Sequence, residues 1–190
     1  MLKLKGILAS ASFNIRQYIY QSSLMASPTQ INELLAEYSM DKYYIRFNDK
    51  SFANHIAHCI VALGHLGADK DRIQRGLDIE VRTQRPASYG LRENDDARLK
   101  NPDENPRVTY YDFLNFYRQK YEIFHSKNID SLIQAEFPGL ISFIHADAFH
   151  ALIQIGYGLA AGYDATVIEG LAWLHYAGKS TIELGKEELC

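Results

Sequence analysis

Three of the seven histidines fall in one apolar segment, at His55, His58 and His65. If this segment is helical, His55 and His58 lie about 60° apart and one turn along, so their imidazoles can converge. His58 and His65 are about 10 Å apart along a helix, which is too far to share one metal ion. Because neutral imidazole binds iron, copper, zinc and nickel, His55 and His58 are a candidate metal-binding pair. The alternative is an ordinary buried histidine pair, and Cys59 is favoured to be a small buried hydrophobe.

A second polar group occurs in an apolar segment rich in Gly and Ala. Its members are Asp147, His150, Gln154 and Tyr157, spaced three, four and three residues apart. On a helix this spacing forms one stripe, and buried polar groups must be paired. These side chains therefore either bond one another and a neighbouring helix, or contact a metal, a water molecule or a substrate.

The other histidines show weaker patterns. His145 lies about 140° around a helix from His150 and is a poor partner for it. For His125 and His175 the sequence identifies no polar partner. They are therefore left out of the candidate site.

Two helices are predicted around the first histidine pair. Residues 51–66 are apolar nearly all round, which predicts a buried helix with Ser51 as its N-cap and Gly67 at its end. A more polar helix is predicted from Asp69 to about Arg82, because its apolar residues recur every four positions.

The remaining segments are mostly helical in pattern. Ser27-Pro28 predicts a capped helix start, whereas the aromatic run at 43–47 could be extended. Aromatic residues at helical spacing over 110–124 predict a core helix, and residues 137–177 predict two more helices split near Gly162. Residues 83–107 carry many charges and predict an exposed connection.

These patterns predict an all-α, helical bundle-like single domain. Within it, residues 1–26 form an N-terminal segment of uncertain order, residues 27–178 the helical domain, and residues 179–190 a polar tail. With 190 residues and 47% hydrophobic composition, the chain is long enough to bury one substantial core.

Charge and cysteine usage narrow the class of partner. Twenty Lys and Arg stand against 23 Asp and Glu without a clustered basic face, so we expect neither nucleic acid nor a membrane surface as a partner. No apolar stretch is long enough to span a bilayer, and the short apolar run after Lys5 is a poor signal peptide. The two cysteines form no disulfide framework, which favours a reducing, cytoplasmic compartment.

Two runs of residues resemble the signatures of a known family. Residues 52–68, Phe-Ala-Asn-His-Ile-Ala-His-Cys-Ile-Val-Ala-Leu-Gly-His-Leu-Gly-Ala, resemble the Phe-His-Asn-His-Ile-Ala-His-His stretch and following Leu-Gly-Ala of the questin oxidase-like family. Residues 150–158, His-Ala-Leu-Ile-Gln-Ile-Gly-Tyr-Gly, resemble its second signature, His-Pro-Leu-Ile-His-Leu-Gly-Tyr, and Glu169-Gly-Leu-Ala follows at the family's spacing. The matches keep their order along residues 41–177.

The resemblance implies a mainly helical oxidoreductase of aromatic polyketide metabolism. Two mechanisms attach to the family: an NADPH-dependent monooxygenase reaction of the Baeyer–Villiger type, and ring opening with O2 at a non-haem iron held by histidines. The chain has no Gly-x-Gly-x-x-Gly fingerprint for a dinucleotide, so NADPH is implied by the resemblance alone. The residues of this chain support the iron mechanism better.

Carrying the motifs over gives His55, His58 and His150 as expected metal ligands. Several positions depart from the signatures: Ala53 and Cys59 replace histidines, Ala151 replaces a proline, and Gln154 replaces the second histidine of the second motif. Gln154 can still offer an oxygen ligand, although a weaker one. Family members are also about twice as long as this chain.

Two functional hypotheses follow. In the first, an Fe(II) centre activates O2 against a small aromatic or quinone-like substrate, with Asp147 orienting His150 and Tyr157 lining the site. In the second, the chain is a non-catalytic helical module that binds a second subunit or another copy of itself. Its short length and incomplete ligand set favour the second hypothesis, and the retained histidines favour the first.

Overall fold

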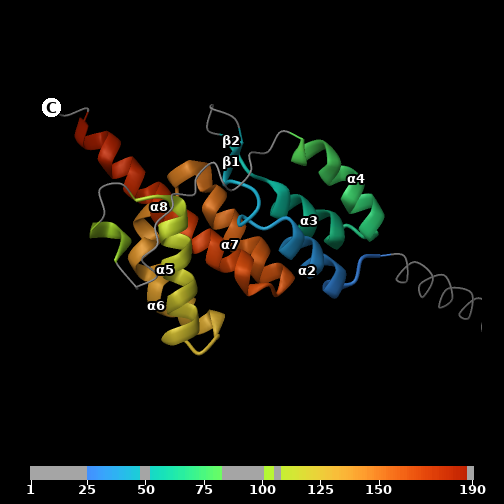
Figure 1. Cartoon of the computed structure of the whole chain (residues 1–190), viewed down its shortest axis with the longest axis horizontal. Coiled ribbons are helices and arrows are strands. Elements are labelled where there is room, and N and C mark those ends of the chain that lie inside the picture. Colours follow the sequence, from blue (N-terminus) through green and yellow to red (C-terminus); the bar gives the residue numbers. More distant parts are fainter. Residues whose placement is uncertain (1–24, 48–51, 83–100, 105–107, 188–190) are drawn as a thin grey trace, which may run out of the picture.

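The computed structural model describes residues 25–47, 52–82, 101–104 and 108–187. Helices dominate these residues, and the predicted all-α, single-domain fold is confirmed (Figure 1). The elements, in chain order, are α2 (Pro28–Glu37), β1 (Arg46–Phe47), β2 (Phe52–Ala53), α3 (Ile56–His65), α4 (Lys70–Val81), η2 (Pro102–Glu104), α5 (Tyr110–Ile123), α6 (Ile129–Leu140), η3 (Ile141–Phe143), η4 (Ala146–Phe149), α7 (His150–Ala161) and α8 (Asp164–Glu187).

Helix α7 lies at the centre of the fold, between the helices of the N-terminal part and α8 (Figure 1). One face of α7 adds Ala151 and Ile155 to a core built with α5, α6 and α8. Tyr157 and Ala161 on the same helix pack against a second core, built from α2, α3 and α4. The two histidine motifs lie on α3 and α7, so this packing places them side by side.

The start of α3 differs from the prediction. Residues 52–53 form β2, which pairs antiparallel with β1 in the register Arg46 with Ala53, so Ser51 is not the N-cap. The N-cap is His55, and the extended conformation suggested for residues 43–47 is confirmed in part by β1. Asn54 explains the shift, since its side chain donates to the Tyr44 carbonyl and accepts from the Ile56 amide. These bonds tie the helix start to the strand pair.

The segment before α7 also differs from the prediction of one helix running from residue 137 to Gly162. Helix α6 ends at Leu140, and two 3-10 turns lead into α7. Asp147, Ala148 and Phe149 all have left-handed backbone torsions, with φ of 52°, 53° and 66°. Asp147 is therefore not on the helix that carries His150. The predicted break near Gly162 is confirmed, with φ of 63° there.

Other predicted boundaries meet the structure as follows. Ser27 caps α2 through a capping box with Gln30, which confirms that helix start. Residues 1–24 and most of 83–107 lie outside the described residues. Within the second of these ranges, residues 102–104 form η2, and Pro102 is buried. Helix α8 continues to Glu187, into the residues expected to form the polar tail.

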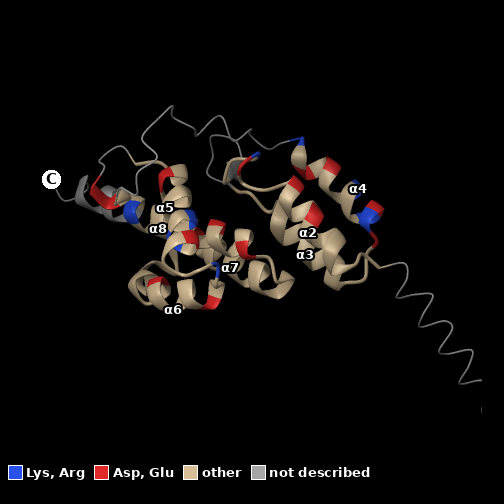
Figure 2. Ribbon diagram, turned by 60° about the horizontal axis from the view of Figure 1, so that its bottom comes forward, with Lys and Arg blue, Asp and Glu red and all other residues tan. Residues whose placement is uncertain are grey.

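No helix in the described residues is both long enough and apolar enough to cross a membrane. Charged residues of both signs are interspersed on α4, whereas α3 and α7 carry none (Figure 2). The two helices that bear the histidine motifs therefore place no Asp, Glu, Lys or Arg of their own beside the histidines.

Candidate functional site

The structure brings His55, His58 and His150 together. The Nε2 atoms of His55 and His150 lie 2.9 Å apart, although 95 residues separate them in sequence. The ring centroid of His55 is 4.9 Å from that of His150 and 5.6 Å from that of His58. His55 stands at the N-cap of α3 and His150 is the first residue of α7, so two helix starts meet at this point.

The backbone of Asp147 orients the imidazole of His150. The Asp147 carbonyl accepts from Nδ1 of His150 at 2.6 Å, which places the proton on Nδ1 and leaves a lone pair on Nε2. The separation of 2.9 Å from His55 then suits an N–H···N hydrogen bond donated by His55. It also suits a shared metal ion, since two nitrogens at about 2.1 Å and a right angle are about 3.0 Å apart.

His58 is buried against the neighbouring residues of α7. Its side chain stacks on Tyr157 with ring centroids 5.1 Å apart. Burial is the main reason that its pKa falls to about 4, and the charges of His55 and His150 lower it further. The imidazole is therefore neutral near pH 7, and its Nε2 is buried without a hydrogen-bond partner.

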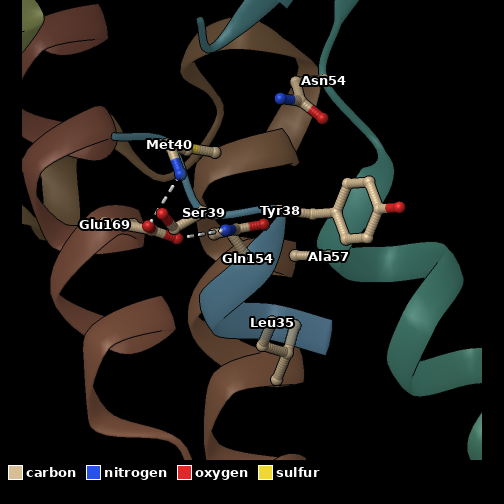
Figure 3. Close-up of a pocket in the computed structure, with 8 residues that line it drawn as sticks. All are labelled: Leu35, Tyr38, Ser39, Met40, Asn54, Ala57, Gln154 and Glu169. Atoms are coloured by element: carbon tan, nitrogen blue, oxygen red, sulfur yellow. Dashed lines mark hydrogen bonds between the residues drawn. The ribbon is translucent and has the colours of Figure 1, made fainter. Parts of the chain in front are cut away.

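Gln154 and Glu169 extend the polar group into the core. Gln154 is fully buried and donates through Nε2 to Oε2 of Glu169 at 3.2 Å, while its Oε1 has no hydrogen-bond partner. The other oxygen of Glu169 accepts from the Met40 amide at 2.9 Å (Figure 3). Burial raises the pKa of Glu169 to about 7, against the lowering effect of these hydrogen bonds.

Trp173 links α8 to the same site. Its indole Nε1 donates to the Asp147 carboxylate at 2.7 Å, and its ring stacks on His150 with centroids 6.3 Å apart. The contact of Asp147 with His150 thus runs through the backbone, whereas the sequence led us to expect the side chain. Sequence reasoning missed Glu169 and Trp173 as site residues. The signal for Glu169 was a single carboxylate in the apolar run 167–174.

The other histidines lie apart from this group. His65 is exposed at the end of α3, although the sequence placed it in a helix predicted to be buried. His125 pairs with the Ser131 hydroxyl, and Nδ1 of His175 lies 2.9 Å from the Tyr117 hydroxyl. The Nε2 of His175 is also 3.2 Å from Asp103. Both histidines therefore have polar partners that the sequence did not identify.

The described residues were searched for groups of side chains that could bind a metal ion. They contain no set of three or more His, Cys, Asp or Glu side chains grouped so that it could hold a metal ion by itself.

The described residues also line an open recess of about 520 Å³ between α5 and α8, where Arg118, Tyr121 and Tyr163 meet. None of its lining residues belongs to the histidine group, so recess and histidines are separate features.

The family model described as questin oxidase-like matches residues 52–188, which include both histidine motifs and Glu169. Among curated proteins, a Baeyer–Villiger oxidase of Pestalotiopsis fici is 29% identical over 147 residues, covering 73% of this chain and 33% of its own length. A Baeyer–Villiger monooxygenase of Cryptosporiopsis sp. is 25% identical, covering 77% and 34%. A Baeyer–Villiger oxidase of Paecilomyces divaricatus is 26% identical, covering 76% and 33%.

The chain therefore spans about a third of the length of these relatives. No solved structure matches it.

Proposed function

The chain belongs to the questin oxidase-like family, and from this membership we propose that it serves in the O2-dependent oxidation or ring cleavage of an aromatic, quinone-like molecule at a non-haem iron. The Baeyer–Villiger oxidases among its relatives support an oxidase of the aromatic polyketide type. The iron and the substrate are the parts of this proposal that go beyond family membership.

The observation that carries the iron proposal is a pair of buried polar atoms without partners. His58 Nε2 and Gln154 Oε1 are both buried and make no hydrogen bond. Leaving such atoms unsatisfied costs about 1–3 kcal/mol each, so a guest that binds both would be stabilised there. Imidazole nitrogens and an amide oxygen suit iron in kind. His55 and His150, whose Nε2 atoms already face one another, would hold the ion first. His58 and the weaker donor Gln154 would complete the set only after their side chains turn, because no three such ligands are grouped for a metal in the described residues.

The chain's own residues would prepare this site in three ways. The Asp147 carbonyl fixes the proton of His150 on Nδ1, so that Nε2 faces His55. Tyr157 stacks on the ring of His58 and would hold it in place. The packing of α3 on α7 holds the imidazoles together. A bound iron would supply the activation of O2.

NADPH belongs to the proposal only as the electron source of a Baeyer–Villiger reaction. Inserting one oxygen atom from O2 and reducing the other to water requires two electrons, whereas ring cleavage that keeps both oxygen atoms requires none. Consumption of NADPH in step with O2 would therefore separate the two reactions once a substrate is found.

Metal content tests the proposal without a substrate. After anaerobic reconstitution with Fe(II), we expect about one iron per wild-type chain and almost none in His55→Ala, because His55 faces both other imidazoles. His65→Ala is the matched control, since His65 lies on the same helix and is exposed. Iron would be measured by mass spectrometry after desalting, with circular dichroism to compare helix content. Equal iron in the wild type and His55→Ala would contradict the ligand assignment.

A second candidate function is a helical module that associates with itself or with a second subunit. The observation in its favour is an exposed, wholly apolar face of α7 and its N-cap, called here the α7 apolar face: Phe149, Ile153, Gly156, Leu159 and Ala160. Phe149 and Leu159 are each 49% exposed and Ile153 is 40% exposed. A contiguous apolar surface of this kind often marks a protein interface.

The second function can be tested by the molecular mass of the protein in solution. If copies associate through the α7 apolar face, light scattering after size exclusion should give a dimer, and Ile153→Lys should return it to a monomer. Ile79→Lys is the matched control, because Ile79 is 74% exposed on α4, away from that face. A wild-type chain that stays monomeric at all concentrations would rule out self-association.

A further inference from the structure

The amide of Gln154 is the point where the histidine group meets the buried carboxylate of Glu169. Glu169 is 2% exposed and Gln154 is fully buried. Each oxygen of the carboxylate accepts one N–H, from the Met40 backbone and from Gln154 Nε2. Figure 3 shows the Gln154 nitrogen turned toward Glu169 and the oxygen on the side away from it. The carboxylate therefore contacts only the donor end of this amide.

The oxygen end of the amide points away from Glu169, on the side of Ala57, which precedes His58 on α3 (Figure 3). Gln154 Oε1 and His58 Nε2 are both buried without a hydrogen-bond partner. Gln154 raises the pKa of His58 against the effect of burial, as an acceptor near an imidazole does, although the geometry of a full hydrogen bond is not reached. The small pocket that Gln154 and Glu169 line together with six other residues has no space for a water molecule. Direct contacts alone can thus decide which end of the amide faces which neighbour.

We propose that Glu169 is a positioning residue, which holds the amide of Gln154 so that its oxygen, and not its nitrogen, faces His58. The physical reason is the cost of the reverse orientation. Turning the amide over would place its oxygen against a carboxylate oxygen, now 3.2 Å from the amide nitrogen. When the carboxyl is ionised, two acceptors would then face one another without water between them, so the experiments below are made at a pH above 7. The Met40 amide fixes the carboxylate by binding its other oxygen.

The orientation of the Gln154 amide decides whether an acceptor or a donor lies beside His58. An amide oxygen beside His58 attracts a cation or an N–H group, whereas an NH2 group would repel a cation and donate to the ring. The consequence for metal binding rests on the proposed function. The consequence for the proton on the His58 ring does not, because it applies to the metal-free protein.

The first experiment uses the metal-free chain and the variant Glu169→Gln, which keeps the shape and removes an uncompensated buried charge. Nitrogen chemical shifts of the histidine rings report which ring nitrogen carries the proton, and His58→Gln identifies the His58 signals. We expect a single tautomer of His58 in the wild type and the other tautomer in Glu169→Gln. The Met40 amide takes the one oxygen of the new side chain, whose NH2 group then faces Gln154 and draws the Gln154 oxygen away from the ring.

The second experiment measures Co(II) affinity by its visible absorption. We expect Glu169→Gln to weaken binding about 10- to 100-fold, the range found when a group that orients a ligand is lost. Gln154→Leu should weaken it as much, and the double variant no further, because Glu169 acts through Gln154. Independent structural effects would instead add.

The outcomes separate this inference from the proposed function. A tautomer change in Glu169→Gln without Co(II) binding by the wild type would support the positioning role and contradict the metal site. An unchanged tautomer together with Co(II) affinity equal to that of the wild type would overturn the positioning role and leave the metal site standing. Additive losses in the double variant would also overturn it.

Discussion

As the pH rises from 4.5 to 7, the free energy of unfolding of Glu169→Gln is expected to increase by about 3 kcal/mol relative to that of the wild type. Burial raises the pKa of Glu169 from 4.5 to about 7, so the folded wild type binds a proton over this range that the unfolded chain has lost. The contribution of protonated Glu169 to the stability of the wild type is fully present below pH 4.5 and is lost as the pH rises through 7. Glutamine cannot ionise and escapes this loss.

His58 makes the free energy of unfolding of the wild type change with pH in the opposite direction. Its pKa falls from 6.5 to about 4 in the folded chain, so its stabilising contribution is present above pH 6.5 and is lost as the pH falls through 4. His58→Gln should therefore gain about 3 kcal/mol relative to the wild type as the pH falls across that range. Where the two ranges overlap, the contributions of His58 and Glu169 oppose each other in the wild type.

Urea denaturation of the metal-free chain at closely spaced pH values, with a chelator present, measures both effects. Glu33→Gln removes a surface carboxylate and controls for the loss of one negative charge. Parallel pH profiles for the wild type and Glu169→Gln would show that Glu169 stays ionised in the folded chain. The burial of its carboxylate would then be compensated more fully than its two N–H donors suggest.

Replacing Gly158 with alanine is expected to lower the free energy of unfolding by about 3 kcal/mol. A Cβ at this position would lie 2.7 Å from both the backbone nitrogen and the Cγ2 of Val167, and 3.0 Å from the carbonyl carbon of Thr166. The backbone of α8 cannot move aside without disturbing its packing on α7. The glycine is therefore required by the close approach of the two helices.

Gly156 provides the control on the same helix. It is exposed, and a Cβ there would meet nothing within 4 Å. Gly156→Ala should raise the free energy of unfolding by up to about 1 kcal/mol, because alanine favours a helix more than glycine does. Chemical denaturation of the two variants in parallel measures the difference. Equal stability of both variants would mean that α7 and α8 can separate at little cost.

Several features of this protein follow from the sequence alone, because they depend on neighbouring residues. The capping box of Ser27 with Gln30 and the four-residue spacing of Ile73 and Leu77 are local patterns, and both predicted their helices. The break at Gly162 also follows from one residue's torsional freedom. The two histidine runs, at 52–68 and 150–158, were enough to indicate the family.

Only the tertiary structure decided which polar groups meet. His55 pairs with His150 across 95 residues, and Met40 binds Glu169 across 129. No periodicity encodes such pairs, since they depend on how α7 packs between α3 and α8. The left-handed turn at Asp147 and the β2 pairing before α3 were missed for the same reason. In both, contacts with other parts of the chain override the local helical preference, and they set where the two histidine-bearing helices begin.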